Sequence, residues 1–224
     1  MQLYMNPVSN TSRPVRLLIM ENKIPVEERT IDFNSGEHLK EPYISLNPNG
    51  LVPTLVDDDF VLTESSAIMK YLADKFNLST YPKDLRKRAR VNEMMDWFNT
   101  GFYRDYGYGV VYPQIYPHHK RVTEDAQSTT IAWGKDQTKK WLKVLNDKLL
   151  GKGHKYLCGD DLTIADIFGA ALLTCGYVTR DDFKGYPNID RWLKNVGSLK
   201  SWPAINEAVD GFRAAVKDQK FVNV

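Results

Sequence analysis

Hydroxyl side chains gather near the start of the chain, just before a segment with helical periodicity. Ser9, Thr11 and Ser12 lie in the turn that precedes the helix predicted at residues 13–21. Ser and Thr at such a position commonly cap a helix by accepting a backbone hydrogen bond. A hydroxyl there can also donate to an anion, which the first N–H groups of the helix stabilise further. The three residues are therefore candidates for either role.

A second helix start offers a complementary pair of polar groups. Glu64 and Ser65 open the helix predicted at residues 64–76. Unpaired backbone N–H groups at a helix N-terminus bind carboxylates. The start of this helix is therefore a candidate carboxylate site, and capping of the helix is the alternative explanation.

Several other chemistries have no candidate residues. Cys158 and Cys175 are the only cysteines, and they are far apart, which excludes a disulfide framework and favours the cytoplasm. Neither lies in the first 77 residues, so dithiol exchange has no nucleophile there. His118 and His119 are adjacent, and adjacent side chains do not converge on one ion, so no metal site is expected. The chain has no P-loop, no dinucleotide-binding glycine motif and no HExxH motif.

Composition narrows the possible partners. The 224 residues include 30 Lys and Arg against 28 Asp and Glu, which leaves a net charge of +2. Such a balance creates no field that attracts nucleic acid or an anionic membrane. The longest apolar run, residues 167–178, is roughly half the length of a membrane-spanning helix. The start shows no secretion signal, and the basic run at residues 86–90 is interpreted as a solvated helix start or a dimer contact.

The predicted secondary-structure pattern divides the chain into two parts. The first part alternates short strands and helices in the order β-α-β-α-β-β-α, with segments at residues 3–5, 13–21, 26–31, 37–46, 52–56, 60–62 and 64–76. After it only helical periods remain, at residues 86–103, 123–149, 164–178, 189–196 and 204–216. We therefore predict an α/β domain at residues 1–77, a linker at 78–85 and an all-helical domain at 86–224.

Four motifs occupy the boundaries of the predicted elements in the first part. They are Pro7–Arg13 at the first turn, Gly36–Pro42 after the second strand, Leu46–Leu55 before the hairpin and Leu62–Ile68 at the third helix. In the second part, Leu162–Ile167 contains a capping box formed by Thr163 and Asp166. Together these motifs resemble the soluble glutathione transferases, most closely their serine-type theta, delta and phi classes. The resemblance implies a thioredoxin-like N-terminal domain, glutathione as co-substrate and no further cofactor.

The resemblance also assigns the residue that activates the thiol. A free thiol has a pKa near 8.5, so an enzyme must stabilise the thiolate to use it at neutral pH. The serine of these classes corresponds to Ser9, with Thr11 and Ser12 as alternatives in the same turn. Other classes use a tyrosine of the first strand followed by a Gly-Arg pair. That pair is absent here, so Tyr4 is expected to be a core residue.

The same comparison implies how the glutathione peptide is held. Glu64 is expected to face the γ-glutamyl ammonium, and Ser65 to bind the neighbouring carboxylate. A cis bond at Val52-Pro53 is expected to leave both backbone groups of Val52 unpaired for the cysteinyl residue. His38 is expected to contact the glycyl carboxylate.

The chain departs from the family pattern around that last carboxylate. Gly50 stands where delta-like members carry a second histidine, and Leu39 and Leu51 stand where phi-like members carry Lys and Gln. Lys40 or Asn49 is the candidate to bind the glycyl carboxylate in place of these missing residues.

The helical part is expected to supply the acceptor pocket, because tyrosines are dense between residues 103 and 116. Phe102, Tyr106 and Tyr112 are the residues we select, and core packing is the alternative explanation for them. The resulting prediction is a homodimeric detoxification enzyme that joins glutathione to a small hydrophobic electrophile. A glutathione-dependent peroxidase or disulfide reductase, and a transferase-like interaction module without activity, are the alternatives.

Overall fold

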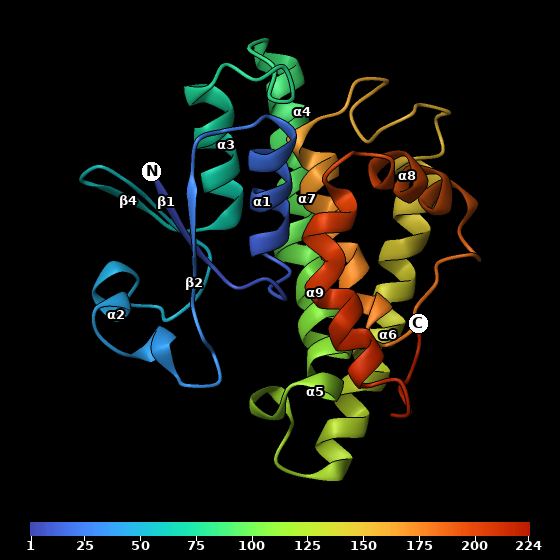
Figure 1. The fold of residues 1–224 in the computed structure, drawn as a ribbon. Helices are drawn as coiled ribbons and strands as arrows, with labels where there is room; N and C mark the ends of the chain where they lie inside the picture. The colour runs from blue at the N-terminus through green and yellow to red at the C-terminus, as the bar shows by residue number, and fades with distance from the viewer.

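The computed structural model describes residues 1–224, and its N-terminal part is built on one mixed sheet (Figure 1). The strands are β1 (Gln2–Met5), β2 (Glu27–Thr30), β3 (Thr54–Asp57) and β4 (Phe60–Leu62), in the spatial order β2-β1-β3-β4. β1 and β2 are parallel, whereas β1–β3 and β3–β4 are antiparallel. The thioredoxin-like domain is therefore present, with the predicted hairpin at its edge.

Helices cover both faces of this sheet. α1 (Ser12–Glu21) and α3 (Ser65–Lys75) pack on the face that turns toward the helical domain (Figure 1). The segment predicted as one weak helix at residues 37–46 forms two short pieces, the 3₁₀ turn η1 (Glu37–Leu39) and α2 (Tyr43–Leu46). Pro42 lies between them and has no N–H to donate, so the helix cannot run through.

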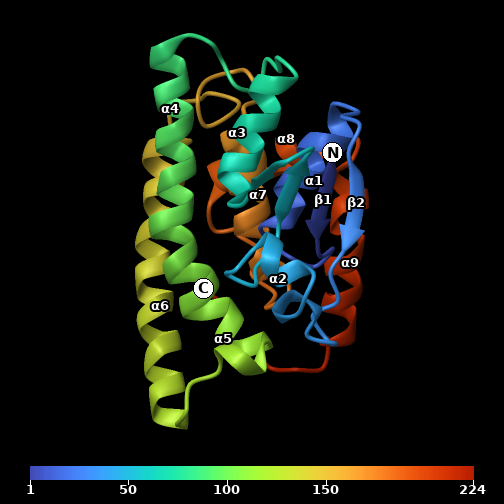
Figure 2. The same cartoon turned by 90° about the vertical axis from the view of Figure 1, so that its left-hand side faces the viewer.

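The C-terminal part is entirely helical, as predicted. Its elements are α4 (Leu85–Asp96), η2 (Trp97–Phe102), η3 (Arg104–Val111), α5 (Tyr112–Ile115), η4 (Pro117–His119), α6 (Glu124–Val144), η5 (Leu145–Leu149), α7 (Ile164–Leu173), η6 (Thr174–Tyr177), α8 (Pro187–Gly197) and α9 (Trp202–Ala215). α4 continues through the π-helical η2 and η3 into α5 as one long rod beside α6 (Figure 2). The part of this rod after residue 103 was not predicted, because Gly107, Gly109 and Pro113 lower its helical propensity.

α7 is the central helix of the molecule. All ten of its residues are buried, and it packs against α1 and α3 of the first domain as well as α4 and α8. The predicted capping box is present: the Asp166 carboxylate accepts from the Thr163 N–H at 2.9 Å. The same carboxylate also accepts from the Leu157 N–H at 2.8 Å and the Trp192 indole at 2.9 Å. Asp166 therefore joins three segments of the helical core.

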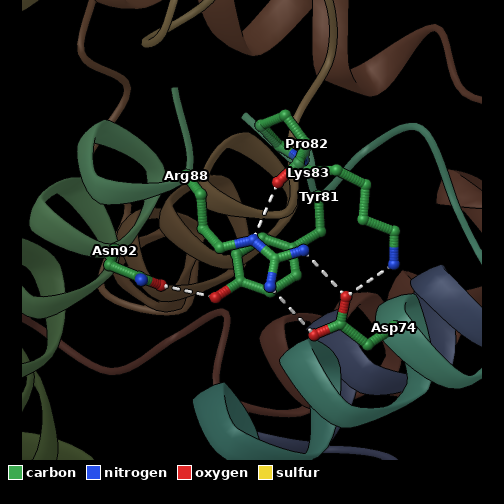
Figure 3. A network of polar contacts seen from close by, with 6 residues as sticks. All are labelled: Asp74, Tyr81, Pro82, Lys83, Arg88 and Asn92. Carbon is green, nitrogen blue, oxygen red and sulfur yellow. Dashed lines mark hydrogen bonds and ion pairs between the residues drawn. The ribbon is translucent and has the colours of Figure 1, made fainter. Parts of the chain in front are cut away.

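A polar network holds the connection between the two domains (Figure 3). The Arg88 guanidinium donates to both carboxylate oxygens of Asp74 in α3, at 2.9 and 3.3 Å, and to the Pro82 carbonyl at 2.8 Å. It also lies over the Tyr81 ring, 4.3 Å from the centroid, and Lys83 adds an ion pair to Asp74. Arg88 thus ties α4 to α3, a role that the interpretation of the basic run as a solvated helix start or a dimer contact did not include. No helix of the chain is long and apolar enough to span a membrane.

Candidate active site

A cavity of about 780 Å³ lies between the two domains. Loops and helix starts of the α/β domain form one wall, and the rod from η2 to α5, together with Tyr116 and the following turn η4, forms the other. We call these the turn wall and the tyrosine wall. The turn wall contains Val8–Thr11, Phe33, His38, Leu39, Asn47, Asn49–Pro53 and Thr63–Ser65, and the tyrosine wall contains Asn99, Tyr103, Arg104, Tyr108, Tyr112, Tyr116, His118 and His119.

Ser9 lies at the N-terminal end of α1 and lines the cavity. Its Oγ accepts the backbone N–H of Ser12 at 3.2 Å and lies 3.1 Å from the Thr11 hydroxyl. Thr11 gives its only hydroxyl proton to the Val52 carbonyl, 3.0 Å away, so the Ser9 hydroxyl must be the donor in the pair. Capping uses a lone pair of Oγ, and the proton, which points to Thr11, can turn to a ligand instead. The two roles considered for Ser9 are therefore compatible.

The two alternatives to Ser9 differ in access. Ser12 is fully buried and does not line the cavity, and its hydroxyl lies 3.5 Å from the Asn6 N–H. Thr11 does line the cavity. Its bond to the Val52 carbonyl corrects the expectation that both backbone groups of Val52 are unpaired, because this acceptor is already occupied by a side chain. Tyr4 lies outside the cavity and packs on Tyr43, with ring centroids 5.8 Å apart.

Glu64 and Ser65 stand where α3 begins, and both line the cavity. Glu64 precedes the helix in a left-handed conformation, with φ at 66°, and its side chain does not cap the helix. The first N–H groups of a helix have no partner within it, so the end of α3 remains open to an anion. The capping explanation for Glu64 therefore fails.

The remaining predicted residues of the turn wall also reach the cavity. Val52 and Pro53 are joined by a cis bond, as the resemblance implies. His38 lines the cavity with its ring edge on Phe33, at 4.9 Å between centroids, and its Nδ1 is buried without a hydrogen-bond partner. Asn49 also lines the cavity, but its amide donates to the Asn47 side chain at 3.2 Å.

The tyrosine wall differs from the prediction. Tyr112 lines the cavity, but Phe102 and Tyr106 do not. Both are 0% exposed in the helical core, where the Tyr106 hydroxyl donates to Asp181 at 2.7 Å. Selecting Phe102 and Tyr106 was therefore wrong, since they occupy the opposite side of the rod.

The π-helical turns explain which tyrosines face the cavity. A π-turn brings residues five apart over one another, whereas an α-helix does so for residues three and four apart. Tyr103 and Tyr108 accordingly lie together, with ring centroids 5.4 Å apart, and Tyr108 contacts Tyr112 at 5.0 Å. Burial raises the pKa of Tyr116 to about 12 and the pKa of Tyr112 further, so these side chains stay hydroxyl donors at neutral pH. Burial also lowers the pKa of His119.

A hydrogen-bonded chain that the sequence did not reveal connects the two walls. Asn10, next to Ser9, donates to the Tyr112 hydroxyl at 2.9 Å, and Tyr112 is hydrogen-bonded to Tyr103. The Asn10 side-chain oxygen, Oδ1, accepts from the Arg13 guanidinium at 2.8 Å. Arg13 is fully buried, and its guanidinium also donates to the Ala171 carbonyl of α7 at 2.6 Å. The turn that carries Ser9 is thus anchored to the helical core.

Comparisons with known proteins agree with this geometry. Residues 3–80 match the family profile of the glutathione S-transferase N-terminal domain, and residues 122–200 match that of the C-terminal domain. The human glutathione S-transferase theta-2B is 33% identical over 214 residues, which cover 93% of this chain and 85% of that protein.

Solved structures give the same result. A delta-class glutathione transferase from Nilaparvata lugens is 33% identical with a TM-score of 0.82, covering 96% of this chain and 98% of its own. Human glutathione transferase theta-2, solved in complex with glutathione and an unknown ligand, is 29% identical with a TM-score of 0.82, covering 100% of this chain and 93% of its own.

Proposed function

Since the chain belongs to the glutathione S-transferase family and is a glutathione transferase, we propose that Ser9 activates the glutathione thiol for attack on a small hydrophobic electrophile. The observation that carries this proposal is the Ser9 hydroxyl, which lines the cavity with a proton to donate. The backbone N–H of Ser12 holds its Oγ in place. Glutathione is the co-substrate, and no other cofactor is needed for the step.

The Ser9 hydroxyl acts by stabilising the thiolate, not by removing the proton. On binding, the Ser9 hydroxyl turns from Thr11 toward the glutathione sulfur, at the positive end of the α1 dipole. Lowering the thiol pKa by about two units needs about 2.7 kcal/mol of thiolate stabilisation. A charge-assisted hydrogen bond supplies on the order of 1.5–3 kcal/mol, so one hydroxyl with the helix end is sufficient.

The ends of the peptide are held elsewhere on the turn wall. The open N-terminus of α3, with Ser65, binds the γ-glutamyl carboxylate, and Glu64 pairs with the ammonium. Val52 forms backbone hydrogen bonds with the cysteinyl residue. For its carbonyl to accept from the peptide, Thr11 must share or release that oxygen. With the peptide bound in this way, the sulfur would lie beside Ser9 and opposite the tyrosine wall.

The acceptor then lies against Tyr108, Tyr112 and Tyr116, whose rings form a continuous aromatic surface. Aromatic side chains pack well against other flat or apolar groups, so a hydrophobic electrophile suits the site. The thiol proton passes to solvent, and the thiolate attacks the electrophilic carbon to form the C–S bond. A halide leaves with the electron pair of the broken carbon–halogen bond, whereas the oxygen of an enone or epoxide keeps the displaced pair and takes a proton from water. The cytoplasm, where glutathione keeps thiols reduced, is the proposed location.

We also propose a homodimer. Phe60 and Val61 on the edge strand β4 are exposed beside α3, and Phe60 packs on Tyr71 at 5.4 Å between centroids. An exposed apolar edge strand is normally covered by a partner. Sedimentation should give about twice the mass of one chain, and a monomer at micromolar concentration would contradict the dimer.

A product screen tests the proposed function. Glutathione is incubated with a halide, an enone, an epoxide and a peroxide as alternative acceptors, and the products are identified by mass spectrometry. We expect a thioether conjugate from at least one carbon electrophile, with formation reduced by Ser9→Ala and left unchanged by Ser198→Ala, an exposed serine of the helical domain. Oxidised glutathione as the only product, from peroxide alone, would replace transfer by peroxidase activity.

A further inference from the structure

The far end of the turn wall, beyond Val52, is apolar where a carboxylate is expected. In the proposed arrangement the peptide runs from Glu64 and Ser65 past Val52, so its C-terminal residue would reach the loop at residues 49–51 and the turn η1. Three exposed apolar side chains surround that position: Leu39 is 63% exposed, Leu51 59% and Phe33 38%, and all three line the cavity. We call these three residues the apolar collar.

Cationic groups are scarce at the collar. Lys40 is drawn away, because its ammonium donates to the Ser35 carbonyl at 2.6 Å, and it does not line the cavity. Asn49 is uncharged, and one N–H of its amide is already donated to the Asn47 side chain. His38 has one buried, unpartnered ring nitrogen and therefore offers at most its other nitrogen to a ligand. Arg104, His118 and His119 belong to the opposite wall.

The collar is also sterically built to stay apolar. Gly50 has φ at 62°, a conformation that glycine adopts without strain. A Cβ at this position would lie 2.8 Å from Leu39 Cδ2 and 3.2 Å from the His38 carbonyl oxygen. Leu39 thus occupies the space that a side chain at position 50 would need, and a second polar group cannot be placed there without displacing it.

We propose that this transferase accepts thiol peptides whose C-terminal carboxylate is neutralised, such as glutathione esterified at its glycyl carboxylate, at least as well as glutathione itself. This inference rests on the proposed function, because it takes the thiol peptide to lie along the turn wall. Where a cation holds the carboxylate, esterification removes a charged hydrogen bond and weakens binding by roughly tenfold or more. At the collar, esterification removes only a poorly partnered charge and lets an alkyl group contact Leu39 and Leu51.

The test is calorimetric titration of the whole protein with glutathione and with its glycyl monoethyl ester. We expect the ester to bind with an equal dissociation constant or one up to about tenfold lower, depending on how much of the ethyl group is buried. Leu39→Lys should improve binding of glutathione severalfold and weaken binding of the ester, because the ethyl group loses its apolar contact with Leu39. Leu85→Lys adds the same charge at an exposed leucine outside the cavity and should change neither.

Two results separate the possible failures. If glutathione binds and the ester binds at least tenfold more weakly, the collar proposal is overturned, while the proposed function stands. If neither thiol binds, the assignment of the turn wall to glutathione fails, and the collar proposal fails with it.

Discussion

The two walls of the cavity are built in different ways. The turn wall uses backbone groups and short side chains at the starts of α1 and α3 and in the loop before β3. The tyrosine wall uses large side chains whose positions depend on the π-helical turns of the rod. The first wall is suited to fix one peptide by hydrogen bonds of defined direction, and the second to accept apolar molecules of varied shape. The chain Arg13–Asn10–Tyr112 joins them.

In this account the turn wall binds and activates the thiol, and the tyrosine wall selects the acceptor. Hydrogen bonds from a helix end or a loop are lost one at a time when a side chain is removed. Ring contacts are shared among several tyrosines, so loss of one ring should be partly compensated by its neighbours. Substitutions on the turn wall should therefore have large effects on every reaction, and substitutions on the tyrosine wall smaller effects that depend on the acceptor.

The largest expected effect is a loss of stability, and it concerns Asp166, which lies in the helical domain but does not line the cavity. Asp166→Ala leaves the Leu157 and Thr163 N–H groups and the Trp192 indole without their buried acceptor. We expect a loss of about 3–5 kcal/mol in the free energy of unfolding. Urea denaturation measures it, and turnover per folded molecule should be unchanged. A stable variant with lost turnover would contradict the separation of scaffold from site.

On the turn wall, Ser9→Ala should lower turnover at pH 6.5 by about 10²-fold, or about 2.7 kcal/mol, because the thiol is no longer ionised. Glutathione affinity should change little, since the peptide ends are held by other residues. Much of the loss should be recovered as the pH rises past the free thiol pKa near 8.5. Initial rates across pH measure this. A loss that is equal at all pH values would contradict thiolate stabilisation.

Glu64→Ala should raise the Michaelis constant for glutathione by roughly tenfold, since the ammonium loses a charged partner worth about 1.5–3 kcal/mol. The turnover number at saturation should change much less, because Glu64 does not contact the sulfur. Glu64→Gln keeps the size of the side chain and isolates the charge. An unaltered Michaelis constant in both variants would refute the placement of the γ-glutamyl end.

The smallest effect is expected on the tyrosine wall. Tyr108 lines the cavity and is 43% exposed. Tyr108→Ala should change the Michaelis constant for an aromatic acceptor by a few fold, which corresponds to the loss of about one aromatic contact. The constant for glutathione should stay the same. Tyr106→Phe, in the core, is the matched control and should leave both constants unchanged. Equal effects of the two substitutions would remove the distinction between cavity and core faces of the rod.

The part of the site that could be predicted from the sequence also differs between the turn wall and the tyrosine wall. Ser9, Val52 and Glu64 lie at helix starts and loops whose motifs span a few neighbouring residues, so a resemblance carries their positions well. Phe102 and Tyr106 were misplaced, because the width of a helical turn in η2 and η3 is decided by packing.

Two further features depend on contacts between distant residues. The burial of Arg13 was not predicted, since a fully buried arginine is rare and its partners lie far along the chain, in α7 and α9. The contact between Leu39 and Gly50 could not be foreseen either, because it depends on how η1 folds onto the loop. The alternation of strands and helices, by contrast, was predicted because local hydrophobic periodicity determines it.

The most direct test of the central claim is a titration of the thiol of bound glutathione, followed by thiolate absorbance in the ultraviolet. In the unaltered protein the pKa should lie about two units below the free value near 8.5. In Ser9→Ala it should return toward the free value, whereas in Thr11→Ala and Ser12→Ala it should stay low. A low pKa that persists in Ser9→Ala, or that is lost instead in Ser12→Ala, would contradict the assignment of thiol activation to Ser9.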